Sequence, residues 1–193
     1  MVIKAVVFDC FGVIVMSRRE TLMRDFPEIK EAYPKVEASV DLGRISHGEF
    51  NKLLASMTGL SQQKIEEEYW KTNRINNRIV DYIKKLKASG EYKLSLLTNI
   101  NLDLMSEYID FFKQNGLFDD MVISSEVGLI KPDKKIFELT ASRLGLNTNE
   151  CVMIDDRMVN IDGAKSAGMK AIQFISNNQI FDDLDKLLER NCA

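Results

Sequence analysis

The stretch that decides the fold is residues 1–15, which read MVIKAVVFDCFGVIV. Residues 3–8 form a nearly unbroken apolar run rich in β-branched side chains, and Asp9 follows it directly. Such a run is typical of a strand in a parallel sheet covered on both faces, because that strand has no solvent-facing side. The sequence therefore predicts a buried first strand with a carboxylate at its carboxyl end.

Further runs of the same kind predict four more strands. They cover residues 94–97, 121–123, 151–154 and 171–174. Helical patterns separate the later runs, most clearly over residues 133–144 and 160–167, and a glycine follows each of these patterns. Because strands and helices alternate along the chain, we expect an α/β fold with a doubly wound parallel sheet.

Residues 16–78 differ from the rest, because they carry helical periodicity and no convincing strand. Ser46 and Glu49 match a capping box, in which each side chain satisfies a backbone donor of the other residue. We interpret this segment as a small helical cap inserted after the first strand, over the strand ends. The prediction thus divides the chain into an α/β core domain, residues 1–15 and 79–193, and a helical cap, residues 16–78.

Composition excludes several classes of partner. The 193 residues carry a net charge of -3 without a basic block, which argues against nucleic acid. No apolar stretch approaches the ~18 residues that span a bilayer, so we expect no membrane partner. The N-terminal apolar run is too short for a signal peptide, and the three cysteines match no zinc spacing. We expect a cytoplasmic protein that is a monomer or a homodimer.

Polar residues follow four of the predicted elements at the sheet edge where open α/β sheets bind ligands. They are Asp9, Thr98-Asn99, Lys131 and Asp155-Asp156. Three carboxylates against one ammonium leave an anionic excess, and like charges this close raise each other's pKa. A divalent cation removes the conflict, and Mg²⁺ is commonly bound by one or two carboxylates plus substrate phosphate. We therefore predict a Mg²⁺ cofactor held by Asp155 and Asp156, with Asn160 orienting one of them.

The remaining residues of this group then receive roles in phosphoryl transfer. Asp9 is predicted to be the nucleophile, which splits one difficult hydrolysis into two displacements through an aspartyl-phosphate. Thr98 and Asn99 are expected to bind the phosphoryl oxygens. Lys131 is expected to neutralise the nucleophile and the negative charge that develops on the substrate. The predicted partner is a small phosphorylated metabolite.

These fragments resemble the motifs of the haloacid dehalogenase superfamily, subfamily I. The matching pieces, in the family's order, are VVFDCFGVIV (6–15), LLTNI (96–100), GLIKPDKKIFE (128–138) and VMIDDRMVNIDGAKSAGM (152–169). The last piece and the short helical cap look most like the branch that contains glucose-1-phosphate phosphatase. The resemblance implies a Rossmann-like core, Asp9 as the nucleophile, and a metal bound by Asp9 and by the main-chain carbonyl of Phe11.

Phe11 departs from the family pattern. Most phosphatases of the family carry a second aspartate two residues after the nucleophile, which protonates the leaving oxygen and later activates water. A phenyl ring can do neither, and losing a general acid typically costs about 10²–10⁴ in rate. Its main-chain carbonyl can still meet the metal.

Three interpretations follow from this departure. The first, which we favour, is a phosphatase whose substrate has a good leaving group, such as a sugar phosphate ester at the anomeric oxygen. The second is a 2-haloacid dehalogenase. Dehalogenases resemble the chain at Phe11, but they typically lose the first acid of the pair Asp155-Asp156. The third is a descendant that binds a phosphorylated ligand or a protein and is catalytically weak or inactive.

Overall fold

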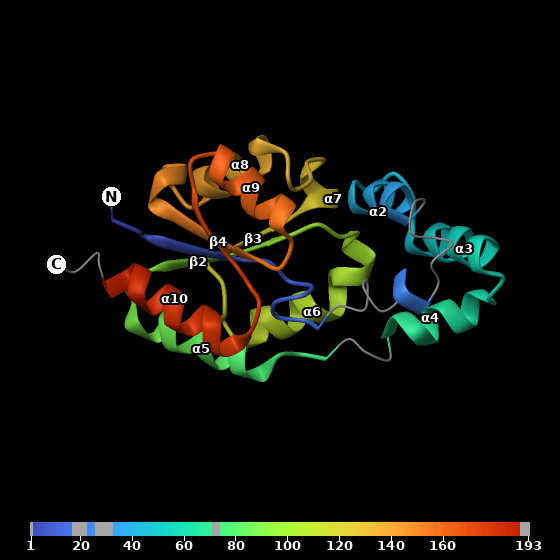
Figure 1. Ribbon diagram of the computed structural model, residues 1–193, viewed down its shortest axis with the longest axis horizontal. Coiled ribbons are helices and arrows are strands. Elements are labelled where there is room, and N and C mark those ends of the chain that lie inside the picture. Colours follow the sequence, from blue (N-terminus) through green and yellow to red (C-terminus); the bar gives the residue numbers. More distant parts are fainter. Residues whose placement is uncertain (1, 17–22, 26–32, 71–73, 190–193) are drawn as a thin grey trace.

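The structure is a computed structural model, and it describes residues 2–16, 23–25, 33–70 and 74–189. At its centre lies a five-stranded parallel sheet with the strand order β3-β2-β1-β4-β5 (Figure 1). The strands are β1 (Ala5–Phe8), β2 (Lys93–Thr98), β3 (Asp120–Ile123), β4 (Cys151–Asp155) and β5 (Lys170–Gln173). From β1 the chain builds β2 and β3 on one side and β4 and β5 on the other. The predicted doubly wound sheet is therefore confirmed, and each predicted strand matches to within two residues at either end.

The strands are apolar throughout because both faces of the sheet are buried. Val6 and Phe8 of β1 belong to one hydrophobic cluster, and Ala5 and Val7 belong to the other. Neighbouring residues on a strand point to opposite faces, so an unbroken apolar run feeds two cores at once.

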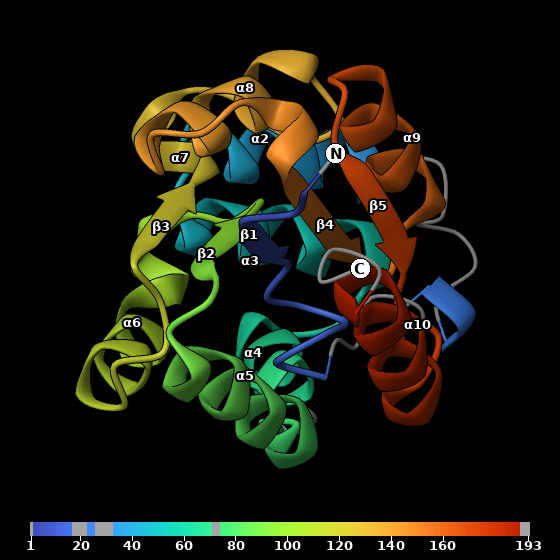
Figure 2. The same ribbon diagram turned by 90° about the vertical axis from the view of Figure 1, so that its left-hand side faces the viewer.

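Helices cover each face of the sheet (Figure 2). One face packs against α5 (Asn77–Ser89), α6 (Leu102–Gln114) and α10 (Asn177–Glu189), and the other against α7 (Ser124–Val127), α8 (Lys134–Arg143) and α9 (Met158–Ser166). The 3₁₀ turn η2 (Thr148–Glu150) precedes β4. The predicted helices 133–144 and 160–167 correspond to α8 and α9, and α9 begins two residues earlier than expected. None of the helices within the described ranges combines the length and apolar character needed to cross a bilayer.

Three further helices lie together beyond the carboxyl edge of the sheet (Figure 1). They are α2 (Tyr33–Asp41), α3 (His47–Thr58) and α4 (Gln62–Trp70). They surround a small apolar core of their own, made by Tyr33, Val40, Phe50, Leu54 and Ile65. The predicted capping box opens α3, since the Glu49 backbone N–H donates to Ser46 Oγ and the Ser46 N–H to Glu49 Oε2. The division of the chain into two domains at residues 16 and 78 stays a prediction, and part of that segment lies outside the described residues.

The two connections to these helices run side by side. Val15 and Ile75 form an antiparallel bridge, and the N–H of Met16 donates to the carbonyl of Arg74 at 2.9 Å. The N–H of Asn76 donates to the carbonyl of Ile14 at 2.8 Å. The chain therefore leaves the sheet and returns to it at one place.

Candidate active site

The predicted polar fragments meet in the crevice between β1 and β4, where the strand order reverses. Asp9 comes directly after β1, Thr98 ends β2, and Asp155 ends β4. A cavity of about 640 Å³ opens at this edge. Six of the seven predicted site residues line it, and the seventh, Asp155, is fully buried behind it. Carboxyl ends of parallel strands share one edge, which is why fragments far apart in sequence converge here.

Lys131 is the buried centre of the site. Its Nζ donates to Asp9 Oδ1 and Asp155 Oδ2, each at 2.7 Å, and to the carbonyl of Leu97 at 2.9 Å. Burial alone would lower the pKa of Lys131, but the carboxylates of Asp155 and Asp9 raise it overall, so the side chain remains an ammonium ion.

Asn99 fixes the main chain of Lys131. Its Nδ2 donates to the Lys131 carbonyl at 2.9 Å, and its Oδ1 accepts from the Lys131 N–H at 2.8 Å. These two hydrogen bonds position the loop that carries the Lys131 ammonium. The sequence pattern did not predict this role for Asn99. Asn99 also lines the cavity, and its assignment to substrate binding stays a prediction.

The two neighbouring aspartates have different surroundings. Asp155 accepts from Lys131 Nζ, from the Arg157 N–H at 2.9 Å, and from Asn160 Nδ2 at 2.9 and 3.0 Å. Its oxygens are thus occupied by protein donors. Asp156 Oδ1 is buried and has no hydrogen-bond partner among the described residues. Burial and the neighbouring Asp155 charge raise the pKa of Asp156 to about 6.

Gly12 allows the Asp156 carboxylate to lie against the loop after β1. A Cβ at this position would sit 2.3 Å from Asp156 Oδ2, and the backbone φ of +94° is one that side chains other than glycine rarely adopt. Only glycine therefore fits here without moving the carboxylate.

The donor set fits a hard divalent cation. One oxygen from each of Asp9, Asp155 and Asp156 lies within 4.8 Å of the others. Burial, followed by the charge of Asp155, raises the pKa of Asp9 well above its ordinary value despite the opposing effect of Lys131. Burial and the neighbouring carboxylate together disfavour the charged form of Asp9, and a bound cation would offset both effects. Because Asp155 is held by protein donors, Asp156 has the oxygen that is better placed for direct ligation, and the ligand assignments stay predictions.

Two other buried polar atoms of the cavity lack a partner in the described part of the chain. They are Thr98 Oγ1 and Asn160 Oδ1. Unsatisfied buried polar atoms are costly and therefore uncommon in folded proteins, so such a group in a cavity indicates a place for a ligand or water. The Thr98 hydroxyl can donate to an oxyanion, as the phosphoryl-binding role requires.

Phe11 forms part of the cavity wall. Its ring packs edge-on against Tyr108 with the centroids 5.6 Å apart and an interplanar angle of 85°. The ring is therefore held against the apolar cluster on one face of the sheet. In the family that the sequence resembles, most phosphatases carry an aspartate at this position.

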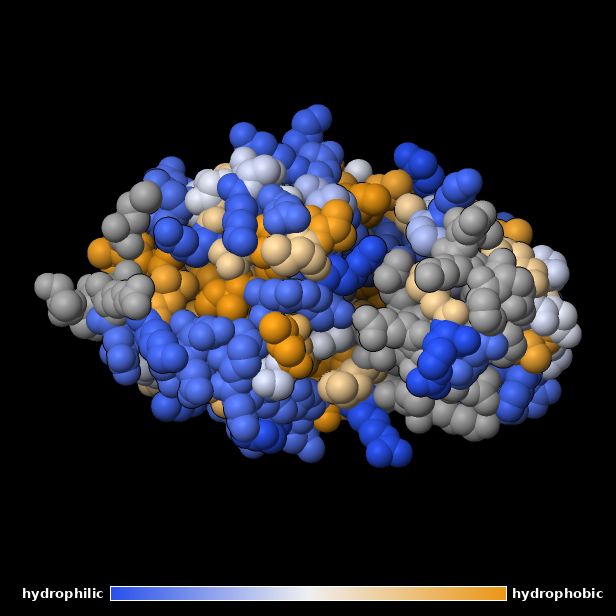
Figure 3. All heavy atoms as spheres, in the orientation of Figure 1, coloured by the Kyte–Doolittle hydropathy of each residue, from blue (hydrophilic) through white to orange (hydrophobic). Residues whose placement is uncertain are grey.

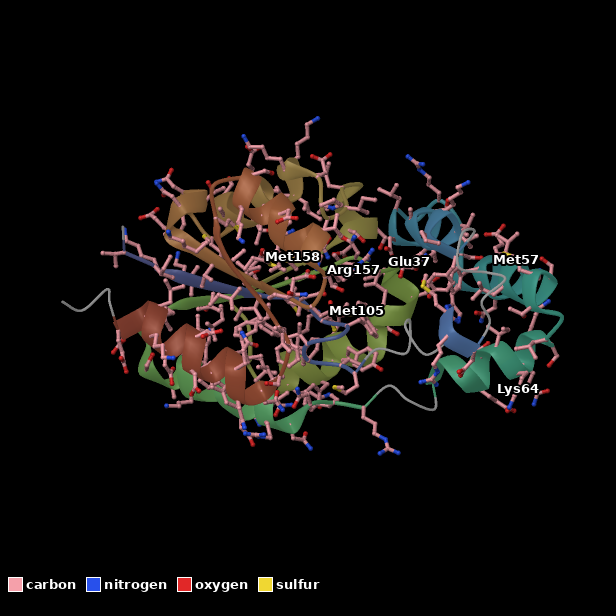
Figure 4. The ribbon with its side chains drawn as sticks, in the orientation of Figure 1. Glu37, Met57, Lys64, Met105, Arg157 and Met158 are labelled. Carbon is pink, nitrogen blue, oxygen red and sulfur yellow. The ribbon has the colours of Figure 1, made fainter. Side chains whose placement is uncertain are left out.

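Three further charged residues line the described part of the cavity and received no role in the sequence analysis, although Arg157 lies within the fragment 152–169. Glu37 and Asp41 come from α2, and Arg157 precedes α9. Arg157, next to the sheet, and Glu37, on α2, face each other with Arg157 Nη1 and Glu37 Oε2 3.9 Å apart (Figure 4). The only available signal was the i, i+4 spacing of the two acids, which places them on one side of a helix.

Three exposed apolar side chains also line the cavity. Met16, Met158 and Ile175 line it and are 48%, 50% and 73% exposed. In Figure 3 apolar residues gather beside the hollow between the sheet and the three helices. These apolar side chains line the cavity together with the charged Glu37 and Arg157.

Comparison with known proteins places this geometry in a family. The sequence pattern of the haloacid dehalogenase-like hydrolases matches residues 3–168. N-acylneuraminate-9-phosphatase of Mus musculus is 30% identical over 156 residues, covering 77% of this chain and 62% of the relative. The chain thus spans less than two thirds of the length of that relative. D-ribitol-5-phosphate phosphatase of Bacteroides thetaiotaomicron is 27% identical over 190 residues, covering 89% of this chain and 91% of the relative.

Solved structures share the architecture. A protein from Porphyromonas gingivalis described as a predicted HAD-like family hydrolase superposes with a TM-score of 0.76 at 25% identity, over 97% of this chain and 98% of its own. A HAD family enzyme from Bacteroides thetaiotaomicron, solved as a magnesium complex, superposes with a TM-score of 0.73 at 24% identity, over 90% and 94%. With the motifs gathered at one sheet edge and most of the chain matched, this protein belongs to the haloacid dehalogenase-like hydrolase family.

Proposed function

We propose that the chain is a Mg²⁺-dependent phosphatase that hydrolyses a small phosphate monoester through an aspartyl-phosphate on Asp9. The observation that carries the proposal is the cluster of Asp9, Asp155 and Asp156 around the buried Lys131 ammonium. The relatives named above are phosphatases of phosphorylated sugars or sugar alcohols by name, which supports a substrate of that class.

The geometry supports a two-step reaction. In the first step a carboxylate oxygen of Asp9 bonds to phosphorus while the bond from phosphorus to the leaving oxygen breaks. Lys131, bonded to Asp9 Oδ1, holds this carboxylate in place and partly neutralises the approaching phosphate. The Thr98 hydroxyl would donate to a phosphoryl oxygen. In the second step water attacks phosphorus, which releases inorganic phosphate and restores the Asp9 carboxylate.

Magnesium would be held by Asp9 and Asp156, together with the main-chain carbonyl of Phe11. Bound there, it would supply the positive charge that lets a phosphate dianion enter a site rich in carboxylates. Asp155 is hydrogen-bonded to Lys131 and Asn160. It would therefore help to hold the neighbouring metal ligands in position without binding the metal directly.

A substrate panel with and without Mg²⁺ tests the proposal. It contains a sugar 1-phosphate, a sugar 6-phosphate, p-nitrophenyl phosphate and a 2-haloacid, and it is run with wild type and with Asp9→Asn. We expect Mg²⁺-dependent phosphate release that Asp9→Asn lowers by about 10³-fold or more, as removal of a nucleophile does in other enzymes. Acid quenching should trap one phosphoryl group on Asp9.

Two other results would replace the proposal. Metal-independent halide release would indicate a dehalogenase, which needs no metal ligand at Asp156. Folded wild type that releases neither phosphate nor halide would indicate a binding protein.

A further inference from the structure

The proposed reaction lacks an evident proton donor. An alkoxide is a poor leaving group, so the oxygen that departs from phosphorus needs a proton, and the water of the second step must lose one. Phe11 occupies the usual place of that acid and cannot supply a proton. Another group on the cavity wall must therefore do so, unless the substrate carries an activated leaving group.

Five side chains on the described wall can carry a proton. They are Asp9, Lys131, Asp156, Glu37 and Asp41. Asp9 is the nucleophile of the proposed reaction, and Asp156 is its proposed metal ligand. Lys131 is held by its two carboxylates and the Leu97 carbonyl. The only histidine, His47, bonds to Asn51 at 2.8 Å and is absent from the cavity wall. Two carboxyl groups of α2 remain.

The two candidates are held differently. Glu37 lies opposite the Arg157 guanidinium, with Arg157 Nη1 and Glu37 Oε2 3.9 Å apart, so we assign it to charge pairing. Asp41 lies one helical turn further along α2 and is only 7% exposed, although it lines the cavity. Asp41 is therefore a largely buried acidic residue that lines the cavity.

Ser124 fixes Asp41 to the sheet. Its Oγ donates to the Asp41 carbonyl at 2.6 Å and accepts from the Ile100 N–H at 2.8 Å. Ile100 lies two residues beyond Thr98, so one side chain connects Asp41 to the strand end that carries the phosphoryl-binding hydroxyl. Gly43 packs against Ser125 in the same region, where an added Cβ would be 3.3 Å from the serine Cβ. The end of α2 is therefore positioned by the core rather than by the three-helix cluster alone.

We propose that Asp41 is the general acid and base that replaces the missing second aspartate, an inference that rests on the proposed phosphatase function. In the first step its carboxyl proton passes to the leaving oxygen as the bond to phosphorus breaks and the bond from phosphorus to Asp9 forms. In the second step its carboxylate takes a proton from the attacking water. Inorganic phosphate leaves, and both Asp9 and Asp41 return to their starting states.

The test compares two substrates that differ in their need for a proton. Glucose 6-phosphate has an alkyl leaving group, whereas p-nitrophenyl phosphate has a leaving group that departs as a stable anion. We expect Asp41→Asn to lower kcat/KM for glucose 6-phosphate, or for the best alkyl phosphate of the panel, by about 10²–10⁴. For p-nitrophenyl phosphate, kcat/KM should fall less than about tenfold, since that ratio reports the first step alone.

A second readout follows from the slowed second step. With p-nitrophenyl phosphate, Asp41→Asn should give a burst of nitrophenol equal to the enzyme concentration, and acid quenching should trap phosphate on Asp9. Adding Phe11→Asp to Asp41→Asn should restore the alkyl-phosphate kcat/KM at least about tenfold by returning an acid to its usual place. Glu67→Gln, which removes an exposed acid from α4, is the matched control and should change neither ratio.

The alternatives give distinct results. An equal loss on both substrates would show a structural role for Asp41, and no loss on either would show that it takes no part; both overturn the inference. A selective loss in Glu37→Gln instead would assign the role to Glu37. If wild type releases phosphate from neither substrate, the phosphatase proposal fails and this inference fails with it.

Discussion

Replacing Asp156 by asparagine should stabilise the metal-free protein while it removes the response to magnesium. Burial and the charge of Asp155 raise the pKa of Asp156 from its ordinary 3.8 to about 6. This rise means that ionised Asp156 destabilises the folded state by about 3 kcal/mol at pH 8, where the side chain is charged in both folded and unfolded chains. Asparagine removes the charge, but its amide leaves polar atoms without partners. We therefore expect a net gain of up to about 2 kcal/mol.

The pH dependence of this gain follows from its sign. A carboxyl group whose pKa is raised by folding favours the folded state when protonated, below about pH 4, and loses that contribution as the pH rises through about 6. The advantage of Asp156→Asn should therefore vanish near pH 4 and be complete above pH 7. Thermal melts in EDTA would show it as a rise of about 2–4 °C in Tm for each kcal/mol.

Magnesium should reverse the ranking. At a concentration 100 times its Kd, a ligand that binds only the folded state stabilises it by about 2.7 kcal/mol. Wild type should gain this stabilisation and Asp156→Asn should not. Asp162→Asn, which changes an exposed acid on α9, should behave as wild type in both buffers. The reasoning is refuted if Asp156→Asn is less stable than wild type in EDTA at pH 8, or if magnesium shifts both proteins equally.

Three further substitutions probe the same site. Lys131→Met leaves the buried carboxylates of Asp9 and Asp155 without a cationic partner, and urea melts should show a loss of about 3–5 kcal/mol; an unchanged midpoint would contradict the central role of the ammonium. Gly12→Ala sets a methyl group against the Asp156 carboxylate, so the magnesium-induced rise in Tm should disappear while circular dichroism still reports a folded chain. Ser124→Ala removes the partner of two buried backbone groups and should cost about 1–3 kcal/mol by urea melt, whereas Ser125→Ala next to it should cost less.

The sheet and the acids at its edge could be predicted because both depend on local pattern. A strand buried on both faces is apolar throughout, as Val6, Val7 and Phe8 are, and the residue after it must lie at the ligand-binding edge. The positions of Asp9 and of the pair Asp155-Asp156 at this edge could therefore be predicted from the sequence alone.

The division of labour within the site could not be predicted in this way. Asp155 and Asp156 are neighbours of identical type, and only the tertiary contacts of Lys131 and Asn160 make one a buried acceptor and leave the other with an unpartnered oxygen. Asp41 lines the cavity, and its main-chain carbonyl accepts a hydrogen bond from Ser124, 83 residues away in sequence. No periodicity or spacing along α2 reports such a contact.

The paired connections at Val15 and Ile75 have a consequence for engineering. Opposed residues of an antiparallel pair lie about 5 Å apart, a gap that a turn of two to four residues closes. The intervening polypeptide can therefore be excised or exchanged for that of a relative without stretching the sheet, since the length of an insertion between two fixed, adjacent ends adds little entropic cost. Chimeras joined at these two points would keep Asp9, Thr98 and Asp155 at the strand ends, but they would lose Asp41 unless the relative supplies an acid in its place.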